Sequence, residues 1–69
     1  MEPEEMNLSQ VRFAITANNA KLDAEWIAKI QRNPEPTEGD APEVLLGKAL
    51  YRRFYYLTTT TRADSELFV

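Results

Sequence analysis

Apolar residues recur every three to four positions in the first half of the chain, which predicts a helix over about residues 8–33. Its start has the sequence of a capping box, with Asn7 as the cap and Gln10 three positions later. Met6 and Val11 have the spacing of a hydrophobic staple. We expect this helix to end where a proline follows, because the residue before a proline is driven out of helical geometry.

A second apolar pattern predicts another helix over about residues 41–60. Residues 34–40 are expected to form an irregular connector, because prolines and a glycine punctuate this stretch. Asp40 is placed to cap the second helix, with Glu43 at its third position. The prediction is therefore an all-α helical hairpin, one small domain over residues 1–69 with a short C-terminal tail.

The threonines at residues 58–61 leave another fold open, because threonine is a modest helix former and a good strand former. In this alternative, a small α+β fold, strands lie near residues 11–16 and 56–61, and the chain breaks at Asn18 and Asn19. The pattern alone thus leaves residues 58–61 as helix, strand or coil.

The first predicted helix carries two apolar faces. One face consists of Val11, Ile15, Leu22, Trp26 and Ile30. The other is rich in alanine and consists of Phe13, Ala17, Ala20, Ala24, Ile27 and Ala28. A two-helix hairpin supplies only one neighbour, and small side chains let another helix come close. We therefore predict an oligomer interface formed by Phe13, Ala17, Ala20, Ala24 and Ile27.

The second predicted helix also has two faces. Its inner face consists of Leu46, Leu50, Phe54 and Leu57, widened by Val44, Tyr51 and Tyr55. Its outward face carries Leu45, Lys48, Ala49, Arg52, Arg53 and Tyr56. Because tyrosine and arginine are enriched among the residues that dominate protein interfaces, we predict that the outward face contacts a partner protein.

Composition narrows the chemistry. A domain of 69 residues buries only about 60% of the surface that its unfolded chain exposes, so additional stabilisation is usual. Cysteine and histidine are both absent, which removes disulfides, the usual zinc sites and catalysis by thiol or imidazole. We expect no enzymatic activity, no metal and no cofactor, and we expect stabilisation by self-association or by docking on a larger protein.

The chain also lacks the usual marks of a membrane or secreted protein. No apolar run approaches the roughly 20 residues that span a bilayer. The N-terminal sequence MEPEEM is acidic, unlike a secretory signal. A cytoplasmic protein without a membrane partner is therefore expected.

The net charge of −3 is distributed in blocks. The tail over residues 1–6 and the connector are acidic, whereas residues 44–62 carry four basic residues and no acid. This basic stretch supports an alternative function, a nucleic-acid-binding regulator in which Lys48, Arg52 and Arg53 meet phosphates and Tyr56 stacks on a base. The acidic sequence pI of about 4.8 makes nucleic acid the less favoured partner.

No family resemblance is apparent from the sequence. The functional prediction is a small non-catalytic protein-binding module, such as an inhibitor, adaptor, regulator or accessory subunit. It would bind a larger protein through its helix faces and self-associate as a dimer. The sequence leaves open whether Leu67, Phe68 and Val69 pack back on the domain or sit in a groove of a partner.

Overall fold

A computed structural model describes the backbone of residues 1–67 and the side chains of residues 1–59. Within that range the chain forms a 3₁₀ turn and three α-helices. They are η1 (Pro3–Glu5), α1 (Leu8–Asn19), α2 (Ala24–Arg32) and α3 (Pro42–Leu67). Residues 1–67 contain no strand, so the all-α prediction is confirmed and the α+β alternative is wrong. The side chains of Leu67, Phe68 and Val69 lie outside the described residues.

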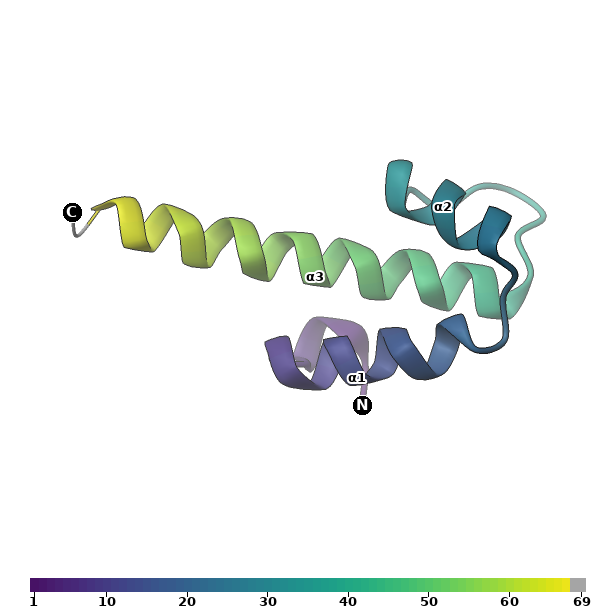
Figure 1. The fold of residues 1–69 in the computed structure, drawn as a ribbon, viewed down its shortest axis with the longest axis horizontal. Helices are drawn as coiled ribbons and strands as arrows, with labels where there is room; N and C mark the ends of the chain where they lie inside the picture. The colour runs from purple at the N-terminus through teal and green to yellow at the C-terminus, as the bar shows by residue number, and fades with distance from the viewer. Residues whose placement is uncertain (68–69) are drawn as a thin grey trace.

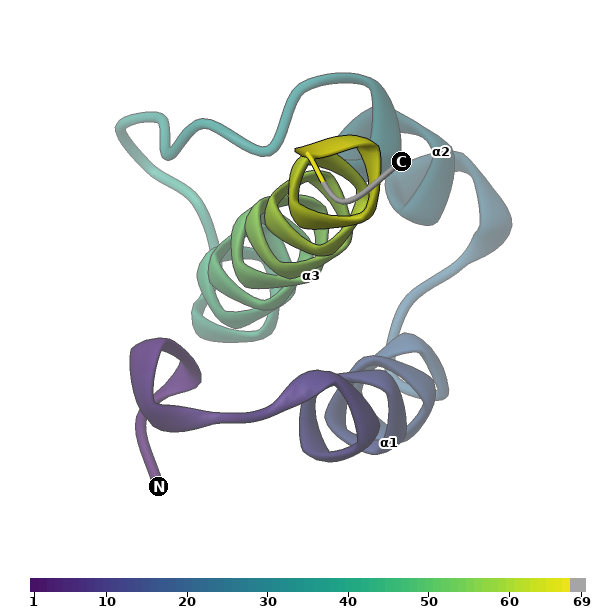
Figure 2. The same cartoon turned by 90° about the vertical axis from the view of Figure 1, so that its left-hand side faces the viewer.

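The helices are arranged around α3, which is the longest element with 26 residues. Helices α1 and α2 pack against neighbouring sides of its first half, and the last part of α3 projects beyond both of them (Figure 1). Viewed along α3, the turn η1 and the connector lie on the other side of that helix (Figure 2). The arrangement resembles a hairpin in which α1 and α2 together form the first arm and α3 forms the second.

The predicted single helix over residues 8–33 is wrong, because the chain breaks between α1 and α2. The side chain of Asn18, which is buried, donates a hydrogen bond to the Glu43 carbonyl at 2.9 Å and ties the end of α1 to the start of α3. Asp23 then caps α2 by accepting a hydrogen bond from the Trp26 backbone amide at 3.2 Å. The break turns the chain so that two short helices reach two sides of α3.

The core lies where the three helices meet. It consists of Val11 and Ile15 from α1, Ile30 from α2, and Val44, Leu50 and Tyr51 from α3. Met6, Leu8, Ala14, Leu22, Phe54 and Leu57 pack around it and are partly buried. The first predicted apolar face therefore supplies the core on both sides of the break, although Trp26 remains partly exposed.

The helix ends follow the predicted caps only in part. Asn7 and Gln10 form the predicted capping box, with hydrogen bonds of 2.8 and 2.9 Å. Asp40 does not cap α3, because its carboxylate accepts hydrogen bonds from Thr37 and Lys48 instead.

Helix α3 runs past its predicted end near residue 60 and includes residues 58–61. The Thr58 hydroxyl donates to the Phe54 carbonyl at 3.0 Å, one turn back, a hydrogen bond that threonine can form within a helix. Among the residues described, no helix combines the length and apolar character needed to cross a membrane.

Candidate protein-contact surface on α3

One side of α3 is covered by neither α1 nor α2, and we call it the outer face. It lies between the connector and η1 (Figure 2). Leu45, Ala49 and Tyr56 follow one another along it at helical spacing, and these three residues form its apolar midline. Leu45 is 41% exposed, Tyr56 is 60% exposed, and Ala49 is half-buried. The structure thus brings three of the six predicted partner-binding residues onto one accessible line.

Two arginines flank this midline and turn away from it in opposite directions. Arg52 donates from Nη1 to the Pro34 carbonyl at 2.6 Å, where the connector begins. Arg53 donates from Nε to the Met6 carbonyl at 3.0 Å, next to η1. Both side chains are half-buried, so each one fastens a neighbouring segment to α3. The charges therefore lie at the two edges of the outer face, and its centre is apolar.

The outer face is also hollowed. The depression at this position measures about 210 Å³. It is lined by Pro3, Glu4, Ala49, Arg52 and Arg53. Beside it, the Arg53 guanidinium lies 5.5 Å from the centre of the Tyr56 ring, which restrains this exposed aromatic side chain. The outer face therefore combines a small residue, Ala49, in the depression with a restrained aromatic side chain, Tyr56. Two cations, Arg52 and Arg53, are held in position beside them.

Lys48, the fourth basic candidate of the sequence, does not lie on this exposed surface. Its ammonium forms an ion pair with Asp40 at 2.7 Å, and both side chains are only 7% exposed. The Lys48 ammonium, together with the hydroxyl and backbone amide of Thr37, lowers the pKa of Asp40 from 3.8 to about 2. Lys48 therefore holds the connector against α3. Its spacing of four from Val44 and three from Tyr51, both inner residues, is the sequence signal for that position.

Two tyrosines fasten α2 to the opposite side of α3. The Tyr51 hydroxyl accepts hydrogen bonds from the amides of Asn19 and Gln31, each at 3.2 Å. The Tyr55 hydroxyl donates to the Gln31 carbonyl at 2.9 Å. Partial burial, and secondarily the neighbouring Tyr51, raise the pKa of Tyr55. These rings belong to the helix packing, as the inner face of the sequence pattern predicted.

The five residues of the predicted oligomer interface are divided by the break in the chain. Phe13 is 79% exposed, and it shares an exposed apolar strip with Ala17 and Ala20 at the end of α1. Ala24 and Ile27 lie on α2, so the five residues do not form the continuous helical face from which the interface was predicted. Their role between copies stays a prediction.

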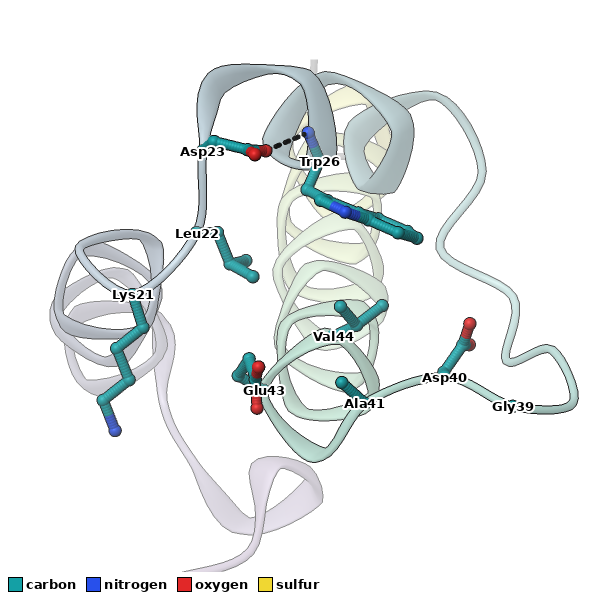
Figure 3. Close-up of a pocket in the computed structure, with 9 residues that line it drawn as sticks. All are labelled: Lys21, Leu22, Asp23, Trp26, Gly39, Asp40, Ala41, Glu43 and Val44. Atoms are coloured by element: carbon teal, nitrogen blue, oxygen red, sulfur yellow. Dashed lines mark hydrogen bonds between the residues drawn. The ribbon is translucent and has the colours of Figure 1, made fainter.

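A second hollow, of about 290 Å³, was not anticipated from the sequence (Figure 3). The Trp26 indole covers it, with Leu22, Ala41 and Val44 below, and the Lys29 ammonium lies 4.8 Å from the centre of the Trp26 ring. The pattern had placed Trp26 in the core. In the structure Trp26 is 38% exposed and lies in the first turn of α2, which begins anew after the cap at Asp23.

Two acidic side chains that line the Trp26 hollow already have partners within the fold. At the Trp26 hollow, the Asp23 carboxylate caps α2 and the Asp40 carboxylate is paired with Lys48. Among the described residues, no group of three acidic side chains is placed to hold a metal ion. Comparison with protein-family models, curated proteins and solved structures finds no match. The outer face of α3 is therefore the feature from which a function is proposed.

Proposed function

We propose that this chain is a non-catalytic protein-binding module that engages another protein through the outer face of α3. It would act as an inhibitor, adaptor or accessory subunit. The observation that supports this most is the exposed apolar midline of Leu45, Ala49 and Tyr56 between two arginines that are drawn to its edges. A small residue at the centre allows a partner helix to approach closely, and an exposed tyrosine offers a large apolar contact.

The arginines add a polar edge to this binding surface. A guanidinium carries five N–H donors, and the hydrogen bonds to Pro34 and Met6 engage one donor on each arginine. The remaining donors are held at fixed positions, which suits carboxylates at the edge of a partner. An apolar centre with a polar rim is the usual anatomy of a protein interface.

The nucleic-acid alternative has less support. Its phosphate contacts would come from Lys48, Arg52 and Arg53, and Lys48 is buried in an ion pair with Asp40. Titration of labelled DNA and RNA at two salt concentrations separates the two functions. Binding that weakens steeply as salt rises would favour the nucleic-acid function. No binding at low salt would remove it.

The direct test is affinity capture from the native host, followed by reconstitution with the purified retained protein. A double variant, Leu45→Asp with Tyr56→Asp, places two charges on the midline and should weaken binding of that protein at least tenfold. Phe13→Asp introduces one charge at an exposed aromatic position on α1, and it is the matched control for each single variant, Leu45→Asp and Tyr56→Asp. Equal binding by the wild type and the double variant would contradict the proposal.

A further inference from the structure

A further hollow lies between α1 and α2, across α3 from the outer face. Both helices pack mainly on α3, and Figure 2 shows them apart from each other on the same flank of that helix. The hollow between them measures about 290 Å³, and we call it the α1/α2 hollow. Three helices contribute its lining, which consists of Arg12, Ile15, Thr16, Gln31, Tyr51 and Phe54.

Part of this lining is apolar. Ile15 and Tyr51 belong to the core, and Phe54 packs against that core while remaining partly exposed. An apolar group placed against these side chains leaves water, which is favourable. Pockets for small molecules begin at about 300 Å³. The α1/α2 hollow therefore suits a small molecule with an apolar body of about one aromatic ring.

The Tyr51 hydroxyl adds a hydrogen-bond donor to the hollow. Tyr51 is only 7% exposed, and its oxygen accepts hydrogen bonds from the side-chain amides of Asn19 and Gln31, each at 3.2 Å. Among the described residues, no hydrogen bond uses the hydroxyl's own hydrogen. A phenol is a donor as well as an acceptor, and a buried donor without an acceptor is costly. An acceptor atom in the hollow would complete the bonding of this group.

Arg12 gives the hollow a positive charge. Its side chain is exposed, and it has no ion-pair partner among the described residues. The described side chains that line the α1/α2 hollow include no acid. The Trp26 hollow differs, because its lining includes Asp23, Asp40 and Glu43. Charge complementarity therefore favours an anion in the α1/α2 hollow.

From these observations we infer that the α1/α2 hollow binds a small organic carboxylate, a molecule with one carboxylate on an apolar ring or short chain. The apolar body lies against Ile15 and Phe54. The carboxylate accepts hydrogen bonds from the Tyr51 hydroxyl and the Arg12 guanidinium, whose paired N–H groups match a carboxylate. The site lies across α3 from the outer face, so it is independent of the proposed function.

Titration followed by NMR tests the ligand class, with phenylacetate as the probe at neutral pH. Saturable shifts should appear at the backbone amides of Thr16 and Gln31, with a dissociation constant of about 1–10 mM for a molecule of this size. Phenylacetamide has the same shape without the charge and should bind about tenfold more weakly. Acetate lacks the apolar body and should also bind more weakly, and phenethylamine, a cation, should not bind. Equal binding of phenylacetate and any of these three, or no saturable binding of phenylacetate, would overturn the inference.

Two variants locate the site. Arg12→Gln should raise the dissociation constant of phenylacetate about tenfold, because it removes a hydrogen bond between charged groups. Arg32→Gln is the matched control, since it removes the same charge from an exposed arginine that does not line the α1/α2 hollow, and it should leave binding unchanged. Tyr51→Phe should also weaken binding, with circular dichroism to check its fold. If Tyr51→Phe does not fold, Arg12→Gln decides, because Arg12 lies outside the core. Unchanged binding by Arg12→Gln, or an equal loss in Arg32→Gln, would contradict a site at this hollow.

Discussion

The two sides of α3 carry similar residues but differ in how far those residues are buried. On the inner side, Leu50 is 1% exposed and Gly47 leaves no spare room, so α1 and α2 pack directly against the helix. On the outer side, Leu45 is 41% exposed, and the polar side chains are fastened to backbone carbonyls at the edges. The difference indicates that folding energy comes from the inner side. The outer side has a defined shape whose apolar part is left uncovered.

The strongest test of this contrast uses two leucines on one helix. Leu50→Ala should reduce the free energy of unfolding by about 2–5 kcal/mol, because it removes a fully buried side chain and leaves a cavity. Leu45→Ala makes the same chemical change on the outer face and should cost about 0.5 kcal/mol or less. Urea unfolding followed by circular dichroism and by the fluorescence of Trp26, the single tryptophan, measures both.

A second pair tests how closely the inner side is packed. A Cβ at Gly47 would lie 3.0 Å from the Asn18 amide nitrogen and 3.2 Å from the Ile30 Cδ1 atom. Gly47→Val should therefore cost about 1–3 kcal/mol, because the added atoms displace the ends of α1 and α2. Ala49→Val introduces valine on the outer side of the same helix and is the comparison. Valine is a poorer helix former than alanine but a better one than glycine, so helix preference works against the expected order, and the loss at Ala49 should still be smaller. Comparable losses would show that the inner side has room and that the contrast between the two sides is weaker than the structure indicates.

The sequence predicted the inner side of α3 better than it predicted the path of the chain around it. Apolar spacing identified Val11, Ile15, Ile30, Leu50 and Tyr51 as core residues, because period 3.6 holds within each helix whether or not the helices are continuous. It was wrong for Leu46, which was placed on the inner face and is 43% exposed. The break between α1 and α2 depends on the bond from Asn18 to the Glu43 carbonyl, which joins residues 25 positions apart. A pairing at that separation leaves no local pattern. The break did have local signals, which are Asn18 and Asn19, where the α+β alternative interrupted the chain, and Asp23, which caps α2.

The candidate surface was predictable to a similar degree. Helical spacing placed Leu45, Ala49 and Tyr56 on an outward line, and the structure leaves that line accessible. It did not show that Arg52 and Arg53 reach the Pro34 and Met6 carbonyls, because the acceptors belong to segments without regular structure. From charge alone, Arg52 and Arg53 were expected to be free cations. In the structure, each one donates a hydrogen bond that holds a neighbouring segment against α3.

The ion pair at the edge of the outer face should give α3 a measurable pH dependence. The pKa of Asp40 is lowered from 3.8 to about 2, so at intermediate pH the unfolded chain binds a proton that the folded chain does not bind. The stabilisation is therefore fully present above about pH 4 and is lost as the pH falls through about 2. The difference in urea midpoint between wild type and Asp40→Asn should shrink over this interval. Glu38→Gln removes a charge from the same connector and is the control, and a difference for Asp40→Asn that persists unchanged to pH 2 would contradict the role of the pair.

The smallest expected effect comes from replacing each of the two arginines in turn. Arg53→Ala removes the hydrogen bond to the Met6 carbonyl and should cost about 1 kcal/mol or less, because one net hydrogen bond contributes that amount. Its local consequence should be larger than its global one, since it releases η1 and leaves the inner side intact. Hydrogen exchange should therefore accelerate several-fold at the amides of Glu5 and Met6, which bond to Glu2 and Pro3 within η1.

Arg52→Ala is the matched variant, because it removes one hydrogen bond at the other edge, to the Pro34 carbonyl. It should accelerate exchange at the Asp40 amide, which bonds to Thr37 within the connector, and leave η1 protected. If exchange accelerates at η1 in one variant and at the connector in the other, while the free energy of unfolding is nearly equal in both, each arginine holds one edge of the outer face in place. If both variants instead lowered protection at Leu50, the arginines would contribute to the core, and the separation between a folding side and a binding side of α3 would not hold.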